Sequence, residues 1–245
     1  MVAVGVVAVA LGGIWFQMLA VFVTSVLIWE VARMIRPTEP VRAMLLAALT
    51  GSVLSGLLAS GSVWHMWLLA VPALAGTLSM PRERQSFFLY ALAIVAAGWG
   101  LVTFREGHGP VWLFWLILVV VATDVLGYFA GRALGGPKFW PRVSPRKTWA
   151  GTIAGWLGGA AVGAAFLPLT GAGTTLILVS AVLSFASQLG DIAESALKRR
   201  MGVKDSSALI PGHGGLFDRF DGLLGAALFL SLATWVIDVP GMQVF

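Results

Sequence analysis

Residues 2–29 read VAVGVVAVALGGIWFQMLAVFVTSVLIW and contain no charged side chain. A helix needs about 20 apolar residues to cross the hydrocarbon core of a bilayer, so this stretch alone is long enough for a membrane span. Five further charge-free runs follow along the chain, at residues 43–81, 85–104, 107–123, 148–190 and 222–237. The sequence therefore predicts a polytopic integral membrane protein.

The composition of the 245-residue chain agrees with that prediction. Apolar residues make up 58% and charged residues only 11%, whereas a soluble domain carries about 25% charged residues. A soluble globule, a nucleic-acid-binding protein and a secreted disulfide-rich protein are excluded. The chain contains no cysteine, which excludes thiol catalysis, disulfides and cysteine metal sites. The net charge of +5 is interpreted first through membrane topology.

We expect an all-α fold with about nine transmembrane helices. Two runs are too long for one crossing and are interrupted, the first by Ser60-Gly61-Ser62 and the second by residues 167–171. The first span is short and has no basic residue before it, so we expect either an upstream start or a segment that does not fully cross. The absence of a charged n-region argues against a cleaved signal peptide. The expected spans are 2–12, 14–32, 43–60, 63–80, 86–104, 110–130, 149–168, 173–195 and 222–238.

The positive-inside rule orients these spans. Of the 16 Lys and Arg residues, 15 fall in alternate loops on one side, and only Arg105 falls on the other. This count predicts that the N-terminus lies inside and the C-terminus outside. Six of the 11 acidic and ten of the 16 basic residues lie between residues 124 and 221. We therefore expect residues 1–110 to form a scaffold and residues 111–245 to form the catalytic region, with its active site at the cytoplasmic face.

Polar side chains share one face at the end of the eighth expected helix. The spacing i, i+3, i+4 and i+7 sets this face, which carries Asp191, Glu194, Ser195 and Lys198. Gly190 is expected to leave room for a neighbouring backbone. The alternative interpretation is a helix end with snorkelling charges and an ion pair within the helix.

The loop that follows combines cations, glycines and carboxylates. It reads KRRMGVKD at 198–205, PGHGG at 211–215 and DRFDG at 218–222. Glycines around His213 allow the backbone to approach a ligand and to present N–H groups to an anion. Helix capping accounts for only one of the two carboxylates at positions 218 and 221. Asp218 and Asp221 together with Asp191 fit oxygen coordination of Mg²⁺ better than they fit capping.

Two further segments are candidates. Asp124 lies inside the sixth expected helix, where an ionisable group costs about 2.5–3.5 kcal/mol, so we expect it to face a polar cavity. A structural hydrogen bond to Tyr128 or to a neighbouring helix is the alternative. Residues 143–148 read VSPRKT. The positive-inside rule explains why this segment is basic, but not why it also carries the two hydroxyls of Ser144 and Thr148. The expected site combines ligands for a hard cation, basic side chains and a glycine loop at one membrane face. Such a set of groups suits phosphate binding. The reaction class that fits it is phosphoryl or nucleotidyl transfer to a lipid head group.

Residues 195–221 closely resemble the signature of the phosphatidate cytidylyltransferase family, the bacterial CDP-diacylglycerol synthases. The resemblance rests on the ordered elements Ser195, Lys198-Arg199, Lys204-Asp205, Pro211-Gly212-His213-Gly214-Gly215 and Asp218-Arg219-Phe220-Asp221. Segments at 124–132, 144–148 and 190–195 also look like family blocks, so the resemblance covers residues 120–225. One departure is Ala150, where the family commonly has Glu, and we assign no carboxylate role to that segment.

The resemblance implies transfer of CMP from CTP to phosphatidic acid, giving CDP-diacylglycerol and pyrophosphate, with Mg²⁺, in the cell inner membrane. A phosphatidate oxygen attacks the α-phosphorus directly, so no protein nucleophile is needed. The expected partners are CTP, phosphatidic acid and the bilayer, with no nucleic acid; oligomeric state is open, with a homodimer as one alternative. Asp191 and Asp218 are expected to bind metal, with Asp221 assisting. The expected catalytic residues are Asp191, Asp218, Asp221, Lys198 and His213. The expected substrate-binding residues are Asp124, Ser144, Arg146, Lys147, Thr148, Arg199, Lys204 and Arg219.

A CDP-alcohol phosphotransferase is disfavoured, because its D-G-x-x-A-R motif and widely spaced later aspartates are missing. Two other functions remain alternatives. A CTP-dependent lipid kinase shares the substrates but transfers the γ-phosphoryl group to a lipid alcohol. A membrane transporter also buries carboxylates and clusters cations, but it should distribute polar residues along several helices, whereas here they gather at one face.

Overall fold

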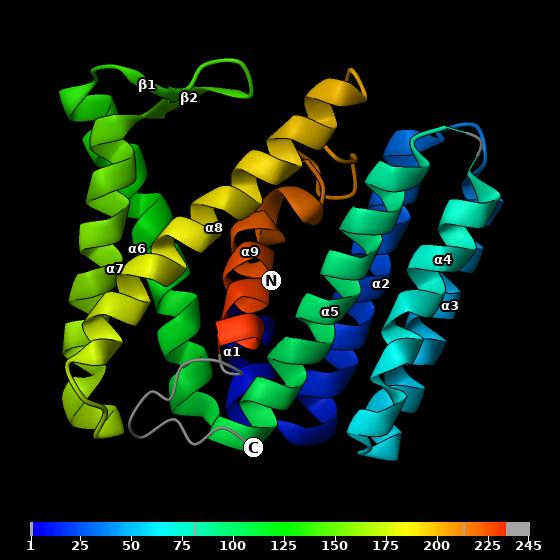
Figure 1. Ribbon diagram of the computed structural model, residues 1–245, viewed down its shortest axis with the longest axis horizontal. Coiled ribbons are helices and arrows are strands. Elements are labelled where there is room, and N and C mark those ends of the chain that lie inside the picture. Colours follow the sequence, from blue (N-terminus) through cyan, green and yellow to red (C-terminus); the bar gives the residue numbers. More distant parts are fainter. Residues whose placement is uncertain (1, 81, 213, 234–245) are drawn as a thin grey trace. The chain divides into compact units, whose positions relative to one another are not determined.

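The computed structural model describes residues 2–80, 82–212 and 214–233, and these ranges are mostly helical (Figure 1). The all-α fold class is confirmed, with one small β-hairpin added. The elements in chain order are α1 (Val2–Leu11), α2 (Gly13–Ile35), α3 (Pro40–Ser60), the 3-10 helix η1 (Val63–Leu69), α4 (Ala70–Ser79), α5 (Arg84–His108), α6 (Pro110–Leu134), β1 (Lys138–Trp140), β2 (Ser144–Thr148), α7 (Trp149–Thr170), α8 (Thr175–Arg200) and α9 (Phe217–Ala233).

Within the described ranges, six helices are long and apolar enough to cross a membrane: α2, α3, α5, α6, α7 and α8. Each of the nine predicted spans contains helix, but α1 and α4 have only 10 residues each. At 1.5 Å per residue, such a helix rises about 15 Å, which is half of the hydrocarbon core of about 30 Å. The six apolar helices indicate a multi-pass membrane protein, and nine crossings stay a prediction.

The chain forms two compact units. Unit 1 comprises Met1–Thr103 and Leu197–Phe220, and unit 2 comprises Phe104–Ala196 and Asp221–Phe245. Most of the family-like signature therefore packs with the N-terminal helices. The predicted division into a scaffold, residues 1–110, and a catalytic region, residues 111–245, is a division by function, and it stays a prediction.

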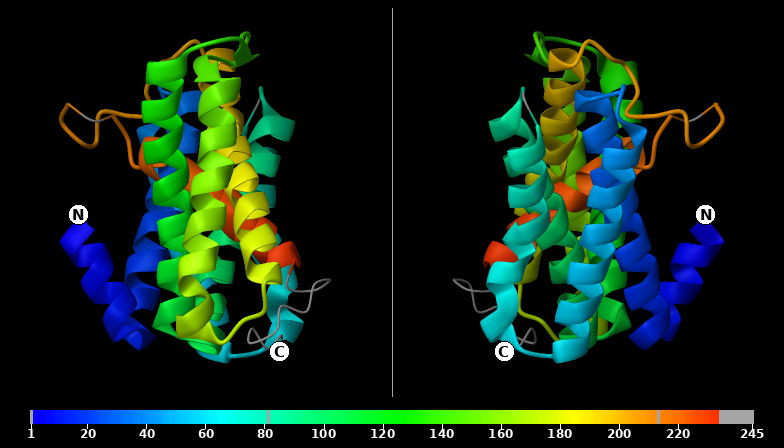
Figure 2. Two further views of the ribbon diagram at one scale, coloured as in Figure 1. Left: turned by 90° about the vertical axis from the view of Figure 1, so that its left-hand side faces the viewer. Right: turned by 90° about the vertical axis from the view of Figure 1, so that its right-hand side faces the viewer.

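In unit 1, α3 and the η1–α4 segment run antiparallel (Figure 1). The chain reverses at Gly61, whose φ of 59° is in the left-handed region that glycine adopts readily. The Ser79 carbonyl at the end of α4 accepts a 2.5 Å hydrogen bond from Arg42 near the beginning of α3. The segment η1–α4 therefore returns along the full length of α3. Figure 2 shows that α1, by contrast, leans away at an angle from α2.

A second contact connects the end of α8 to the α4–α5 turn of unit 1. Arg200 Nε lies 2.7 Å from Glu83 Oε2. Hydrogen bonds from Ser86 and Arg200 hold the pKa of the Glu83 carboxyl below its usual range. The basic segments at 33–42, 82–84 and 198–204 therefore lie at one end of unit 1, as the predicted sidedness requires.

In unit 2, small residues allow α7 and α8 to approach closely. Gly159 and Gly163 of α7 face Ser184 and Ser180 of α8, and a Cβ at either glycine would overlap the facing hydroxyl. Both serines are fully buried. Close packing of small residues is a main source of helix association in lipid. It fixes α8 about two to three turns before its polar face begins at Asp191.

The prediction that Gly190 admits a neighbouring backbone is confirmed. A Cβ at Gly190 would overlap the carbonyl oxygen of Asp221 and would lie 3.0 Å from the backbone of Gly225 in α9. A Cβ at Gly225 would likewise overlap the carbonyl oxygen of Ala186 in α8. This contact holds the beginning of the unit 2 part of α9 against α8, next to Asp191.

The predicted loop between α6 and α7 contains the antiparallel hairpin β1–β2, which was not predicted from the sequence. Lys138 pairs with Thr148 and Trp140 pairs with Ser144. Figure 2 shows the hairpin at the ends of α6 and α7. The Thr148 hydroxyl then caps α7, because it accepts a 3.2 Å hydrogen bond from the Gly151 N–H.

Candidate active site

Three carboxylates meet in unit 2. Asp191 and Glu194 of α8 and Asp221 of α9 each offer an oxygen, and these oxygens all lie within 4.8 Å of one another. The first two share a helical face, as the spacing predicted, and the Gly190–Gly225 contact brings the third. Glu194 is buried. Glu194 was predicted on this face but not as a metal ligand, although its i+3 spacing from Asp191 was the available signal.

The cluster has the donor chemistry of a divalent-cation site. Three neighbouring carboxylates repel one another unless a cation or a proton offsets their charge. Mg²⁺ binds oxygen at about 2.0–2.1 Å, so two of its ligand oxygens are at most about 4.2 Å apart. The observed spread of 4.8 Å is close to that limit, and small side-chain movements would close the difference. The residues therefore fit a hard divalent cation.

A lysine from the β-hairpin lies beside this cluster. Lys147 Nζ is 2.5 Å from Asp191 Oδ2, and both side chains are partly exposed. Asp124 of α6 is close enough to Lys147, Asp191 and Asp221 to interact electrostatically with all three side chains. Unit 2 therefore gathers four of the predicted site residues: Asp124, Lys147, Asp191 and Asp221.

The other predicted residues of unit 2 have different surroundings. Thr148 is buried and its hydroxyl caps α7, which accounts for that hydroxyl without a substrate. Arg146 is exposed on β2, where Ser144 is half-buried. The Tyr128 hydroxyl, the alternative partner considered for Asp124, lies 3.1 Å from Arg132 and accepts its hydrogen bond.

In unit 1, Asp218 organises the loop that carries the signature. Its Oδ1 lies 2.6 Å from Lys198 Nζ. Its Oδ2 accepts hydrogen bonds from the Gly215 N–H at 2.7 Å and from both the N–H and the hydroxyl of Ser206 at 2.9 Å. The carboxylate predicted as a metal ligand thus holds four protein donors. That Asp218 binds a metal ion stays a prediction. Metal binding would require the ion to replace some of these donors at the carboxylate.

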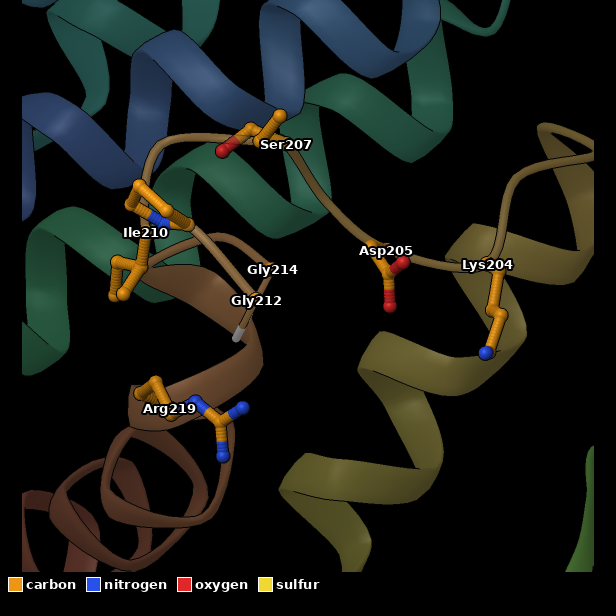
Figure 3. A pocket seen from close by; sticks show the side chains of 9 residues that line it. Lys204, Asp205, Ser207, Ile210, Gly212, Gly214 and Arg219 are labelled. Atoms are coloured by element: carbon orange, nitrogen blue, oxygen red, sulfur yellow. The ribbon is translucent and has the colours of Figure 1, made fainter.

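This loop and the beginning of α9 line an open pocket of about 400 Å³. Its lining includes Lys204, Asp205, Ser207, Ile210, Gly212 and Arg219. In Figure 3 the side chains of Lys204, Asp205 and Arg219 surround the same opening. Two predicted phosphate contacts, Lys204 and Arg219, therefore line one pocket. Arg199 is exposed at the end of α8, and His213 lies outside the described residues.

Glu30 is a polar residue of unit 1 that sequence reasoning missed. It belongs to α2 and is fully buried. It accepts hydrogen bonds from Ser207 Oγ and from the N–H groups of Leu216 and Phe217, at 2.5–2.8 Å. An ionisable group near the end of an apolar span is by itself a signal of a functional site, and here the first expected helices were treated only as scaffold.

Comparison with known proteins adds an independent observation. A phosphatidate cytidylyltransferase of Brucella suis is 44% identical over 162 residues, which cover 64% of this chain and 60% of the relative. Relatives with the same name from Bacillus subtilis and Haemophilus influenzae are 42% identical over 134 residues and 43% identical over 133 residues. These two matches each cover 51% of this chain, and they cover 48% and 46% of the relatives. The chain thus matches less than two thirds of the length of these relatives. The model of the cytidylyltransferase family matches residues 1–237, which is nearly the whole chain. The chain therefore belongs to that family.

Proposed function

We propose that this chain transfers CMP from CTP to phosphatidic acid, giving CDP-diacylglycerol and pyrophosphate for phospholipid synthesis. The observation that carries the proposal is the carboxylate cluster of Asp191, Glu194 and Asp221, with Lys147 bound to its edge. It occurs in a chain that belongs to the cytidylyltransferase family and has 37–44% identical relatives named phosphatidate cytidylyltransferase. A lipid phosphate and a nucleotide triphosphate are the substrates that such a set of charges suits.

In the proposed reaction, a phosphate oxygen of phosphatidic acid attacks the α-phosphorus of CTP. The new P–O bond forms as the bond to the β-phosphate oxygen breaks, and pyrophosphate leaves with the electron pair. Catalysis of this kind is mostly positioning and stabilisation of charge. The chain therefore needs cations and a metal site, but no nucleophile of its own.

We propose that the unit 2 cluster holds Mg²⁺ through Asp191, Glu194 and Asp221. Asp218 of unit 1 keeps its separate prediction as a metal ligand. The bound cation would neutralise phosphate charge and make the α-phosphorus more electrophilic. Lys147, paired with Asp191 at 2.5 Å, would exchange part of that contact for a phosphate oxygen. Asp124 adds negative charge to the same region and strengthens cation binding. Arg146 and Ser144 on the hairpin are further proposed substrate contacts.

We propose that the unit 1 pocket takes phosphate groups of CTP. Lys204 and Arg219 line it, and its volume of about 400 Å³ lies in the range of about 300–1,000 Å³ typical of ligand pockets. Lys198 and Arg199 add positive charge nearby in the same unit. His213 completes the set as a proposed donor to the leaving pyrophosphate.

The proposed location is the cell inner membrane, with the site at the cytoplasmic face. Six apolar helices support a multi-pass arrangement. The 15 of 16 basic residues on one predicted side support the orientation, because cytoplasmic loops retain Lys and Arg. CTP is available on that side. Assembly into a homodimer stays a prediction.

Incubation of the purified protein with phosphatidic acid, Mg²⁺ and CTP labelled at either the α- or the γ-phosphate tests the activity. The proposal expects α-label in a CMP-bearing lipid and γ-label in free pyrophosphate. Transfer of γ-label to diacylglycerol would instead identify a CTP-dependent lipid kinase. Absence of both products from folded protein would contradict the proposed function.

A further inference from the structure

Glu30 is a buried carboxylate near the end of an apolar helix. Its side chain is 0% exposed, and a buried charge is costly unless hydrogen bonds or an opposite charge offset it. Four donors surround it: Ser207 Oγ at 2.5 Å, Phe217 N at 2.6 Å, Leu216 N at 2.8 Å and Ser206 Oγ at 3.3 Å. Phe217 is the first residue of α9 and Leu216 directly precedes it. Both N–H groups therefore lie at the helix N-terminus, where the helix dipole favours a negative charge.

These donors come from both ends of the segment 206–217. One carboxylate in α2 therefore fixes where the loop leaves Lys204 and where it enters α9, one turn before Arg219. Gly215 shows how closely the loop and α2 approach, because a Cβ there would overlap the Ser206 hydroxyl and the Glu30 carboxylate. The pocket cations Lys204 and Arg219 lie just outside the two fixed ends.

Ser206 links Glu30 to Asp218. Its hydroxyl lies 3.3 Å from Glu30 Oε2 and 2.9 Å from Asp218 Oδ2, and its N–H donates to the same Asp218 oxygen. Asp218 in turn holds Lys198. The contacts of Glu30 therefore extend through one serine to the ion pair that Asp218 forms with α8.

We propose that Glu30 is a positioning residue for nucleotide binding, which holds Lys204 and Arg219 in place to bind the phosphates of CTP. This inference rests on the proposed function. The carboxylate already occupies the N–H groups of Leu216 and Phe217, so these groups are not available to phosphate. The positive charge of the pocket must come from the two side chains, and their placement depends on the loop that Glu30 fixes.

The variant Glu30→Gln tests this role while keeping the side-chain volume. Oε1 accepts from the Leu216 N–H and Oε2 from the Phe217 N–H. Whichever oxygen becomes an NH₂ group, one backbone N–H then faces a donor. The matched control is Glu39→Gln in the α2–α3 turn of the same unit, where Glu39 is half-exposed and pairs with Arg36 and Arg42.

We expect Glu30→Gln to lower kcat/KM for CTP at least about tenfold, mainly through a higher KM for CTP, while KM for phosphatidic acid changes less than about twofold. Amide hydrogen exchange should accelerate in the segment 214–217 and stay unchanged in α3. Glu39→Gln should match the wild type in both measurements. Ser207→Ala removes one donor to Glu30 and should change KM for CTP in the same direction but less. Because Ser207 also lines the pocket, its higher KM for CTP supports the inference only together with faster exchange in 214–217. With both measurements, this variant keeps the test informative if Glu30→Gln does not fold.

Unchanged KM for CTP in Glu30→Gln or in Ser207→Ala, with faster exchange in 214–217, would overturn the inference, because the loop would then move without affecting the nucleotide. An equal loss toward both substrates would also overturn it and would indicate a purely structural role. If the wild-type protein formed no CMP-bearing lipid, the proposed function itself would fail. Faster exchange in the variants would then report only on the loop.

Discussion

Lys198 Nζ lies 2.6 Å from Asp218 Oδ1, and both side chains are almost buried, at 14% and 11% exposure. Removing one partner of a buried ion pair typically costs about 3–5 kcal/mol, because the other charge stays uncompensated. The same carboxylate holds Ser206 and Gly215 through Oδ2. Asp218 therefore has an observed role in the loop in addition to its proposed role as a metal ligand, and the two roles have different consequences.

Asp218→Asn separates the two roles of this residue. The new amide NH₂ must face either the Lys198 ammonium or the N–H groups of Ser206 and Gly215, so we expect a loss of turnover of more than about tenfold, which equals about 1.4 kcal/mol. We also expect the Mg²⁺ concentration for half-maximal activity to rise. Formation of the CMP-bearing lipid across a Mg²⁺ titration measures both. An unchanged Mg²⁺ requirement would contradict the metal role and leave only the loop role.

The unit 2 cluster predicts a metal-dependent enzyme. Removal of divalent ions with EDTA should abolish turnover, and added Mg²⁺ should restore it. Asp191→Asn, Glu194→Gln and Asp221→Asn each remove one negative charge with little change in volume, and each should raise the Mg²⁺ requirement at least about tenfold. Full activity of all three variants at low Mg²⁺ would show that the cluster does not hold the ion.

Lys147 predicts the opposite effect on the metal. Its ammonium lies 2.5 Å from Asp191 Oδ2, so Lys147→Met leaves the carboxylates with more net negative charge. We expect turnover to fall at least about tenfold because a phosphate contact is lost, while half-maximal activity requires less Mg²⁺ than in the wild type. The control is Lys138→Met on β1, whose lysine is exposed, and it should change neither quantity. A higher Mg²⁺ requirement in Lys147→Met would refute this arrangement of charges.

The parts of the structure that depend on local pattern were predictable. Apolar runs located the helical segments, and the spacing on α8 put Asp191 and Glu194 on one face. Glu30 was not predictable in the same way, because its partners Ser206 and Leu216 are 176 and 186 residues away in the chain. The β1–β2 hairpin was also missed, since its strands are only three and five residues long. With Pro145 inside β2, they show no clear alternation of apolar and polar residues.

Gly190 offers a test of the packing that brings Asp221 to α8. A methyl group at this position would overlap the Asp221 carbonyl, and overpacking typically costs about 1–3 kcal/mol. We expect Gly190→Ala to lower the melting temperature in detergent and to reduce activity. Gly56 of α3 is the control, since a Cβ there meets no atom within 4 Å and alanine favours a helix by about 1 kcal/mol. Gly56→Ala should therefore be at least as stable as the wild type.

The predicted orientation can be tested by cysteine labelling, because the chain has no cysteine of its own. Ser206 is unsuitable as a labelling site, since it is buried and bonded to Asp218. Ala208 is exposed in the same loop. Cysteines at Ala208 and at Ser144 should resist a membrane-impermeant thiol reagent in intact cells and react after permeabilisation. A cysteine at Gly107, near the single basic residue on the other predicted side, should react in intact cells.

The same variants also test ligand binding. CTP with Mg²⁺, added to opened membranes, should slow labelling at Ala208, which lines the proposed phosphate pocket, and at Ser144, which precedes Lys147 on β2. It should not affect Gly107. Labelling of Ala208 and Ser144 from opposite sides of the membrane would contradict the orientation deduced from 15 of 16 basic residues. A single reaction that needs both basic loops would then be impossible, because CTP is supplied from one side only.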